Sequence, residues 1–186
     1  MGSTRSQYTR KTWTRGSHFI STDPTLISIP QLITVFDSPE CHWAKSMPEE
    51  GMKEMLENSL NFGLYEGSAP KSDATSTTEA DSQSSPRSFI GIARCITDYT
   101  TFLYLTDVWV DSQQQGAGLG RWLISVVQEV IDSMPYLRRS MLFTGDWERS
   151  VPFYEKLMKM EIMETKRGHG VAIMEMKGEG HPMFKR

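Results

Sequence analysis

The chain has 186 residues, enough for one domain with a substantial core, and its 20 Lys and Arg against 23 Asp and Glu give a formal net charge of −3. This mildly acidic balance argues against nucleic-acid binding, and no apolar run reaches the ~18 residues that a membrane span needs. Residues 1–19 lack the apolar stretch of a secretory signal and two cysteines form no disulfide framework, so we expect a cytoplasmic protein, with the nucleus as the alternative.

The N-terminal residues 1–17 are polar, and we expect them to be flexible, with one folded domain over residues 18–186. The opening sequence MGSTRS matches the N-myristoylation pattern at Gly2, and the basic residues that follow it offer a second, electrostatic anchor. Because so short a motif often matches by chance, an unmodified polar N-terminus is the favoured interpretation.

The first clear element is a helix predicted over residues 46–60. Ser46 and Glu49 have the spacing of a capping box, with a proline in the first turn. Apolar residues then recur at helical spacing, namely Met52, Met55, Leu56 and Leu60.

Residues 67–87 consist mainly of Ser, Thr, Asp, Gln and Pro. Such a segment buries too little apolar surface to offset its ordering entropy, so we expect a disordered loop. Strand-like residues flank it on both sides, which predicts a hairpin with an oversized connection.

The second half of the chain alternates strands and helices. Residues 89–97 and 102–110 are rich in β-branched and aromatic residues and are predicted to be strands. The clearest amphipathic helix follows Gly118, then come a strand over residues 139–144, a short helix around Tyr154, and a closing hairpin of residues 161–165 and 171–176. This order predicts a mixed sheet covered on both faces.

A glycine-rich turn, with the sequence QGAGLG at residues 115–120, joins a strand to the start of the amphipathic helix. Glycines let the backbone turn tightly, and the N–H groups at a helix N-terminus form a site for phosphate or pyrophosphate. A Rossmann fingerprint is excluded because Arg121 stands where the third glycine is needed, and the Gly-Lys-Ser/Thr of a P-loop is absent. No His, Cys or carboxylate spacing suggests a metal.

This turn resembles the acyl-CoA signature of the GCN5-related N-acetyltransferase (GNAT) superfamily, Gln/Arg-x-x-Gly-x-Gly/Ala between a strand and a helix. Two further blocks resemble the family: LTDVWV at residues 105–110 and VPFYEKL at residues 151–157. The family's frequent asparagine after its fifth strand and Gly-Phe after the final helix are replaced here by Trp147 and by Lys159-Met160. The resemblance implies a single-domain acyl-CoA N-acyltransferase fold, mixed α+β, with a central, mostly antiparallel twisted sheet and helices on both faces.

The resemblance also implies that acetyl-CoA is the co-substrate, with its pyrophosphate on the turn and its pantetheine arm beside the preceding strand. A backbone N–H of that strand would stabilise the developing oxyanion. The expected acetyl-CoA contacts are Val108, Trp109, Val110, Gln115, Gly116, Ala117, Gly118, Leu119, Gly120 and Arg121.

Two side chains are candidates for proton transfer. Tyr154 stands where the family places a tyrosine near the cofactor sulfur, which implies a general acid for the leaving thiolate. Asp107, a carboxylate inside an apolar strand, is either the general base or a structural hydrogen-bond acceptor. Deprotonation of the amine by water is left open.

We predict direct acetyl transfer from acetyl-CoA to an amine, favouring a small molecule. A protein or peptide amine is an alternative acceptor, and a non-catalytic CoA-binding regulatory module is an alternative function. Trp43 and His169 are assigned weakly to the acceptor pocket, because family acceptors enter between the first helices and the last hairpin. A homodimer is compatible with the sequence, which does not fix the oligomeric state.

Overall fold

A computed structural model of the chain describes residues 4–70, 87–163 and Met174. The helices and strands, in chain order, are α1 (Thr4–Tyr8), β1 (Thr12–Arg15), β2 (His18–Ser21), the 3₁₀ helix η1 (Pro24–Leu26), α2 (Ile29–Phe36), α3 (Glu49–Glu57), β3 (Leu60–Glu66), β4 (Ser88–Thr97), β5 (Phe102–Val110), the 3₁₀ helix η2 (Ser112–Gln114), α4 (Leu119–Asp132), β6 (Arg139–Leu142) and α5 (Ser150–Met158).

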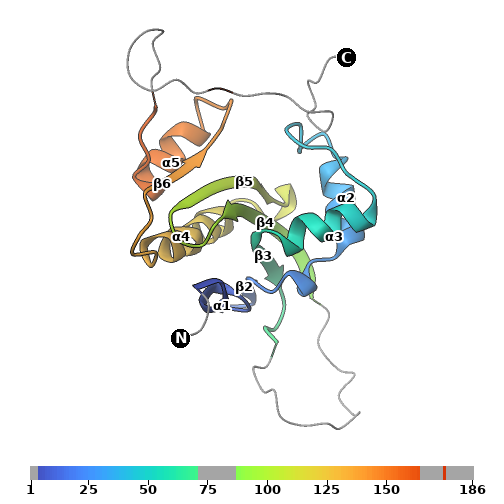
Figure 1. The fold of residues 1–186 in the computed structure, drawn as a ribbon. Coiled ribbons are helices and arrows are strands. Elements are labelled where there is room, and N and C mark those ends of the chain that lie inside the picture. Colours follow the sequence, from blue (N-terminus) through green and yellow to red (C-terminus); the bar gives the residue numbers. More distant parts are fainter. Residues whose placement is uncertain (1–3, 71–86, 164–173, 175–186) are drawn as a thin grey trace.

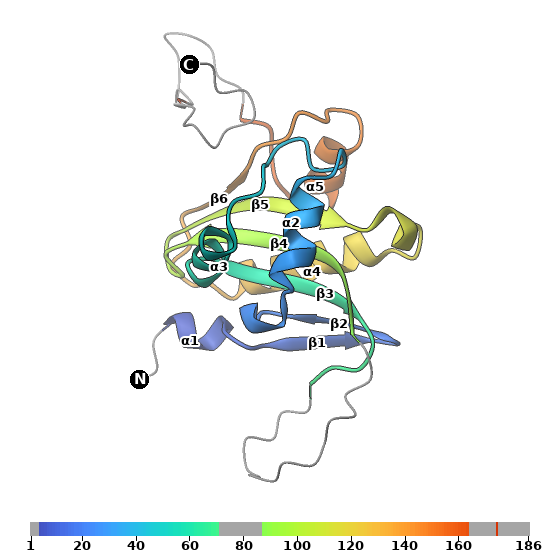
Figure 2. The same ribbon diagram turned by 90° about the vertical axis from the view of Figure 1, so that its right-hand side faces the viewer.

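The six strands form one sheet in the order β1-β2-β3-β4-β5-β6. Every neighbouring pair is antiparallel except β5 and β6, which are parallel. Helices α4 and α5 cover one face and helices α2 and α3 cover the other (Figures 1 and 2). The predicted mixed, mostly antiparallel sheet with helices on both faces is therefore confirmed.

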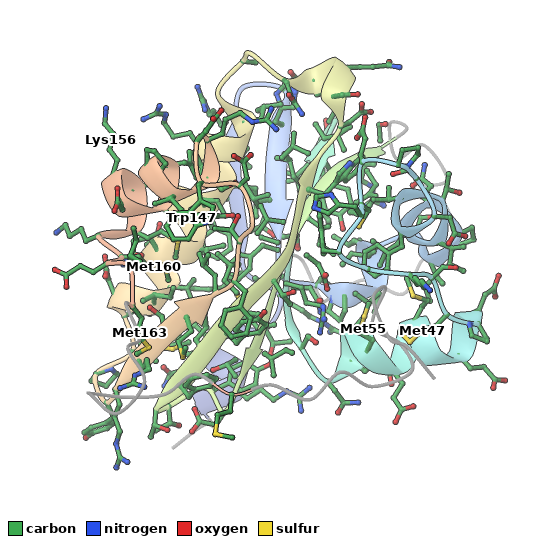
Figure 3. All side chains as sticks on the ribbon, turned by 90° about the horizontal axis from the view of Figure 1, so that it is seen from above. Met47, Met55, Trp147, Lys156, Met160 and Met163 are labelled. Carbon is green, nitrogen blue, oxygen red and sulfur yellow. The ribbon has the colours of Figure 1, made fainter. Side chains whose placement is uncertain are left out.

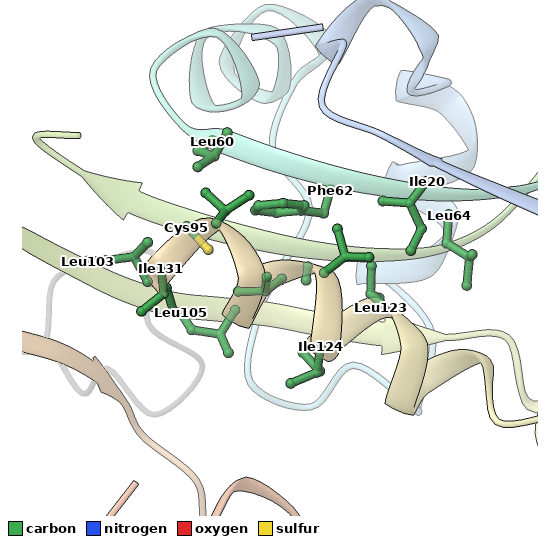
Figure 4. Close-up of a cluster of buried hydrophobic side chains, with 14 of the residues drawn as sticks. Ile20, Leu60, Phe62, Leu64, Cys95, Leu103, Leu105, Leu123, Ile124 and Ile131 are labelled. Atoms are coloured by element: carbon green, nitrogen blue, oxygen red, sulfur yellow. The ribbon is translucent and has the colours of Figure 1, made fainter. Parts of the chain in front are cut away.

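Each face of the sheet has its own core cluster. On the α4 side, fully buried side chains of the central strands pack against the apolar stripe of α4, including Phe62, Cys95, Leu103, Leu123 and Val127 (Figure 4). On the α2–α3 side, Phe19, Leu32, Met52, Tyr65 and Ile92 form the second cluster. Burial of these apolar surfaces is the main force that holds both helix layers on the sheet.

The N-terminal segment differs from the predicted flexible residues 1–17. Residues 4–8 form α1 and residues 12–15 form β1, which pairs with β2. Tyr8 is buried in the α4-side cluster, and Trp13 Nε1 donates to the Glu129 carboxylate at 3.1 Å. These contacts involve residues far along the chain, so the local polar composition gave no sign of them.

Several boundaries also differ from the sequence prediction. Helix α3 begins at Glu49 with Pro48 as its N-cap instead of Ser46, and Leu60 starts β3 instead of ending the helix. Strands β3 and β4 pair as the predicted hairpin, and residues 71–86 of its connection lie outside the described residues. Residues 161–163 form no strand, and the rest of the predicted closing hairpin, with His169, lies outside the described residues.

Among the described helices none has the length and apolar character to cross a membrane.

Candidate active site

Strands β5 and β6 run side by side for only part of their length. Their pairing extends from Phe102 opposite Arg139 to Leu105 opposite Leu142, where β6 ends. Strand β5 continues to Val110, and within the described chain no strand lies beside residues 106–110 on that side. The backbone of this half of β5 therefore presents an edge that can pair with an extended ligand.

A β-bulge stands at the point where this open edge begins. Asp107 and Val108 lie opposite the single residue Ala93 of β4, because Thr106 pairs with Arg94 and Trp109 pairs with Ile92. Asp107 adopts φ 49°, in the left-handed region that aspartate tolerates better than most residues. The extra residue shifts the alternation of side chains between the two faces of the sheet. Leu105 before the bulge and Val108 within it therefore both face the α4-side cluster, whereas Trp109 faces the α2–α3 side.

The Asp107 side chain forms a buried ion pair. Its Oδ2 accepts a hydrogen bond from Arg94 Nε at 2.6 Å, and the two side chains are 7% and 13% exposed. Arg94 Nη1 also donates to Ser59 Oγ at 2.9 Å. The negative charge of Asp107 also affects Cys41. The pKa of Cys41 is raised to about 12, mainly by burial of the thiol and secondly by the nearby Asp107 carboxylate. Asp107 is thus near the α2–α3 side of the sheet, with one oxygen committed to Arg94.

The glycine-rich turn lies between the end of β5 and α4. Gly116 has φ 94° and Gly118, the N-cap of α4, has φ 73°, so both use the conformational freedom of glycine. Asp111 is the N-cap of η2, which precedes the turn, and its Oδ1 accepts a hydrogen bond from Gln113 N at 2.9 Å. Within the described chain the N–H groups of residues 116–121 have no hydrogen-bond acceptor. They are free to bind an anion at the positive end of the α4 dipole.

Arg15, at the end of β1, reaches the same turn from across the sheet. Its Nη1 donates to the Gly118 carbonyl at 3.4 Å, and its guanidinium lies 5.9 Å from the centre of the Trp122 ring. The side chain is exposed and adds a positive charge beside the turn. This contact could not be predicted from a local motif, because 103 positions separate Arg15 from Gly118.

Tyr154 lies on α5 and packs against the α4-side cluster, which also contacts Val108 and Val110. Its ring meets Phe153 edge-on, with ring centres 5.1 Å apart. Burial raises the pKa of Tyr154 to about 12, and its hydroxyl has no hydrogen-bond partner in the described chain. The phenol therefore stays protonated at neutral pH with its proton available to a ligand. Tyr154 and Asp107 thus belong to different sides of β5.

The segment of residues 37–48, between α2 and α3, is tied to the functional end of β5. Trp109 Nε1 donates to Glu40 Oε2 at 3.0 Å, and the pKa of Glu40 is lowered by this bond and by a second one from the Ser112 side chain. The candidate Trp43 lies in this segment, 38% exposed, with His42 edge-on to its ring.

Apolar side chains occur on both sides of β5 in the view from above (Figure 3). Met47 and Met55 come from the α3 side, and Trp147, Met160 and Met163 come from the β6–α5 side. Trp147 is 65% exposed. In residues 4–70, 87–163 and 174 there is no group of three or more His, Cys, Asp and Glu side chains that could hold a metal.

The chain is similar to known acetyltransferases. The model of the acetyltransferase (GNAT) family matches residues 41–160. The Gibberella zeae protein named "Putative acetyltransferase FG08082" is 33% identical over 168 residues, which is 90% of this chain and 93% of that protein.

Solved structures give the same result for the fold. The crystal structure of a GNAT-family protein from Xanthomonas campestris pv. campestris, described there as a putative acetyltransferase, has a TM-score of 0.54 and 28% identity over 82% of this chain and 95% of its own. The GNAT family protein SP0256 of Streptococcus pneumoniae has a TM-score of 0.51 with 16% identity, over 90% of this chain and 97% of its own.

Proposed function

Since this chain belongs to the acetyltransferase (GNAT) family and is an acyltransferase, we propose that it transfers the acetyl group of acetyl-CoA directly to the amine of a small molecule. One observation carries the proposal. The turn of residues 116–121, whose N–H groups have no acceptor among the described residues, lies next to the open edge of β5. A ligand with a pyrophosphate and an extended, amide-containing arm matches both parts at once.

In this proposal the turn binds the pyrophosphate through its backbone, and Arg15 adds a positive charge beside it. The pantetheine arm pairs with the open edge of β5 through backbone groups of Val108 and Val110. A backbone N–H at the bulge donates to the thioester carbonyl, which stabilises negative charge on that oxygen as the amine attacks.

The reaction needs no acyl-enzyme. The neutral amine forms a bond to the carbonyl carbon, the C–S bond breaks, and the amine loses a proton to water. The departing thiolate receives a proton from the Tyr154 hydroxyl, which bulk solvent then restores. Burial raises the pKa of Tyr154, so the hydroxyl carries its proton at neutral pH and is present as a donor when the thiolate forms.

A small acceptor is favoured by the segment of residues 37–48. Glu40 holds this segment against Trp109 and Ser112, so the α2–α3 side of β5 is partly covered. A small amine passes such a cover more easily than a lysine on a folded protein. Exposed Trp43 and Met47 on the segment suit an acceptor with an apolar portion.

The test is release of free CoA thiol from acetyl-CoA in the presence of a panel of amines. The panel includes arylalkylamines, polyamines, amino acids and lysine-containing peptides, each with a no-enzyme control. Turnover of a small amine supports the proposal, and turnover of the peptides alone reassigns the acceptor class. Tight acetyl-CoA binding without thiol release from any amine indicates a CoA-binding regulatory module instead.

A further inference from the structure

We propose that Arg94 is a positioning residue for acetyl transfer, because its buried ion pair with Asp107 holds the bulge that opens β5 to acetyl-CoA. This inference rests on the proposed function and assigns Asp107 a positioning role in place of general base. Arg94 is part of a regular strand and is not expected to touch either substrate.

The first step in the argument is the location of the pair. Asp107 is the left-handed residue of the bulge, and the bulge stands two residues after Leu105, the last residue of β5 that pairs with β6. The ion pair therefore joins the irregular point of β5 to the adjacent regular strand. It lies where β5 changes from a core strand to a ligand-binding edge.

The second step is the fixation of Arg94 itself. Its guanidinium donates to Asp107 on β5 and to Ser59, the residue just before β3. Ser59 Oγ in turn donates to the carbonyl of Met55 in α3 at 2.7 Å. A continuous hydrogen-bonded chain thus runs from Met55 in α3 through Ser59 and Arg94 to Asp107, so the bulge is tied to both α3 and β4.

The third step is the direction of the Asp107 side chain. A general base needs a lone pair that faces the acceptor amine. Here the Oδ2 atom is 2.6 Å from a guanidinium, and Oδ1 lies 3.4 Å from the Thr106 hydroxyl. The carboxylate is thus held mainly through Oδ2, and its short bond to the Arg94 guanidinium is the contact of a structural anchor. Loss of either partner would leave a buried charge unpaired, which favours rearrangement of the bulge.

The experiment compares four variants with the parent protein in the thiol-release assay and by calorimetry with acetyl-CoA. Arg94→Met removes the pair and keeps the aliphatic stem, and Arg94→Lys restores the charge. Asp107→Asn keeps an acceptor oxygen and tolerates the left-handed backbone, but cannot act as a base. Arg10→Met is the matched control, because Arg10 forms an ion pair with Asp23 at 3.4 Å while its side chain is 73% exposed.

We expect Arg94→Met to lower kcat by ~10- to 100-fold, as displacement of reacting groups does, and Arg94→Lys to recover most of that loss. Asp107→Asn should lower kcat less than Arg94→Met does, because the amide oxygen can still accept the hydrogen bond from Arg94 Nε, and the acidic limb of its pH profile should be unchanged. The double variant Arg94→Met/Asp107→Asn should be no slower than Arg94→Met alone, since both act through the same bulge. Arg10→Met should behave as the parent in all assays.

Two results would overturn the inference. One is parental kcat and acetyl-CoA affinity in folded Arg94→Met, which would mean that the bulge does not need the pair. The other is loss of ~10²-fold in kcat with loss of the acidic limb in Asp107→Asn, which would identify a general base. If Arg94→Met does not fold, Arg94→Lys and Asp107→Asn decide alone. If the parent releases no thiol with any amine, the proposed function fails, and the pair is tested by whether Arg94→Lys and Asp107→Asn retain acetyl-CoA affinity while Arg94→Met loses it.

Discussion

The indole Nε1 of Trp109 donates a hydrogen bond to Glu40 Oε2 over 3.0 Å, although 69 positions separate the two residues along the chain. The bond joins the strand that is to bind acetyl-CoA to the segment that is to face the acceptor. Under the proposed function, this bond would connect the donor-binding strand to the acceptor side of the site.

The first prediction concerns this bond. Glu40→Gln should raise the KM for the acceptor amine several-fold while acetyl-CoA affinity changes little, because the segment of residues 37–48 is held less firmly. Hydrogen bonds to the ionised carboxylate lower the pKa of Glu40. Their stabilising effect on the segment is therefore complete above the ordinary carboxyl pKa of 4.5 and is lost as the pH falls through the lowered pKa. Steady-state kinetics at pH 7 check this prediction, with Glu57→Gln on the exposed face of α3 as the control. An unchanged amine KM would contradict it.

The second prediction concerns the turn. Gly118→Val should weaken acetyl-CoA binding by ~5- to 150-fold, because a left-handed backbone at a β-branched residue costs about 1–3 kcal/mol. A Cβ at this position meets only Arg15 nitrogen atoms, at 3.9 Å or more, so the effect comes from backbone strain and not from a collision inside the protein. Gly118→Asn tolerates the left-handed conformation and should lose less affinity. Calorimetry on variants with a native circular-dichroism spectrum distinguishes the two, and equal affinities for parent and Val variant would remove the turn from the binding site.

The third prediction concerns Arg15. Arg15→Met should weaken acetyl-CoA binding by roughly two- to fivefold, the effect of one exposed charge pair. The difference from the parent should shrink at high salt, because screening acts on exposed charges. Calorimetry at low and high ionic strength measures both quantities. A salt-independent loss would mean that Arg15 acts by packing on Trp122.

The fourth prediction concerns Tyr154. Tyr154→Phe keeps the ring and removes the proton donor, so kcat should fall by ~10²-fold while acetyl-CoA affinity stays near the parent value. Because burial raises the pKa of Tyr154 to about 12, the phenol remains protonated below its ordinary pKa of 10 and ionises only as the pH rises through the raised value. The parent should therefore show no loss of kcat from this group between pH 7 and 9. Parental kcat in a Phe variant of matched melting temperature would make Tyr154 a core residue only.

Elements with strong periodicity were predictable from the sequence. Strands β4 and β5, helix α4, helix α5 and the glycine turn all follow from local apolar patterns and from glycines at fixed spacing. The predicted acetyl-CoA contacts lie in two nearby stretches, residues 108–110 and 115–121. The first lies on the open edge of β5, and in the second the N–H groups of residues 116–121 have no acceptor within the described chain.

The remaining features depend on residues that are distant in sequence. Strand β1 is stabilised by its pairing with β2 and by the contact of Trp13 with Glu129 on α4. Because these contacts are not local, the four residues of β1 show no apolar pattern that predicts a strand. Arg94 looks like an ordinary strand residue until its partner Asp107 is placed beside it. The bulge itself is invisible in the sequence, because apolar side chains on both faces of β5 conceal the change of facing.

The unequal pairing of β5 has a consequence for its dynamics. Up to Leu105 the strand is hydrogen-bonded on both sides, whereas in the part of the chain that the structure describes residues 106–110 have a strand partner only on the β4 side. Amide protons of this second half that point away from β4 should exchange with solvent far faster than those of the first half. Acetyl-CoA, lying along that edge, should slow them to rates near those of the core. Hydrogen exchange along one strand would then report occupancy of the site without any turnover.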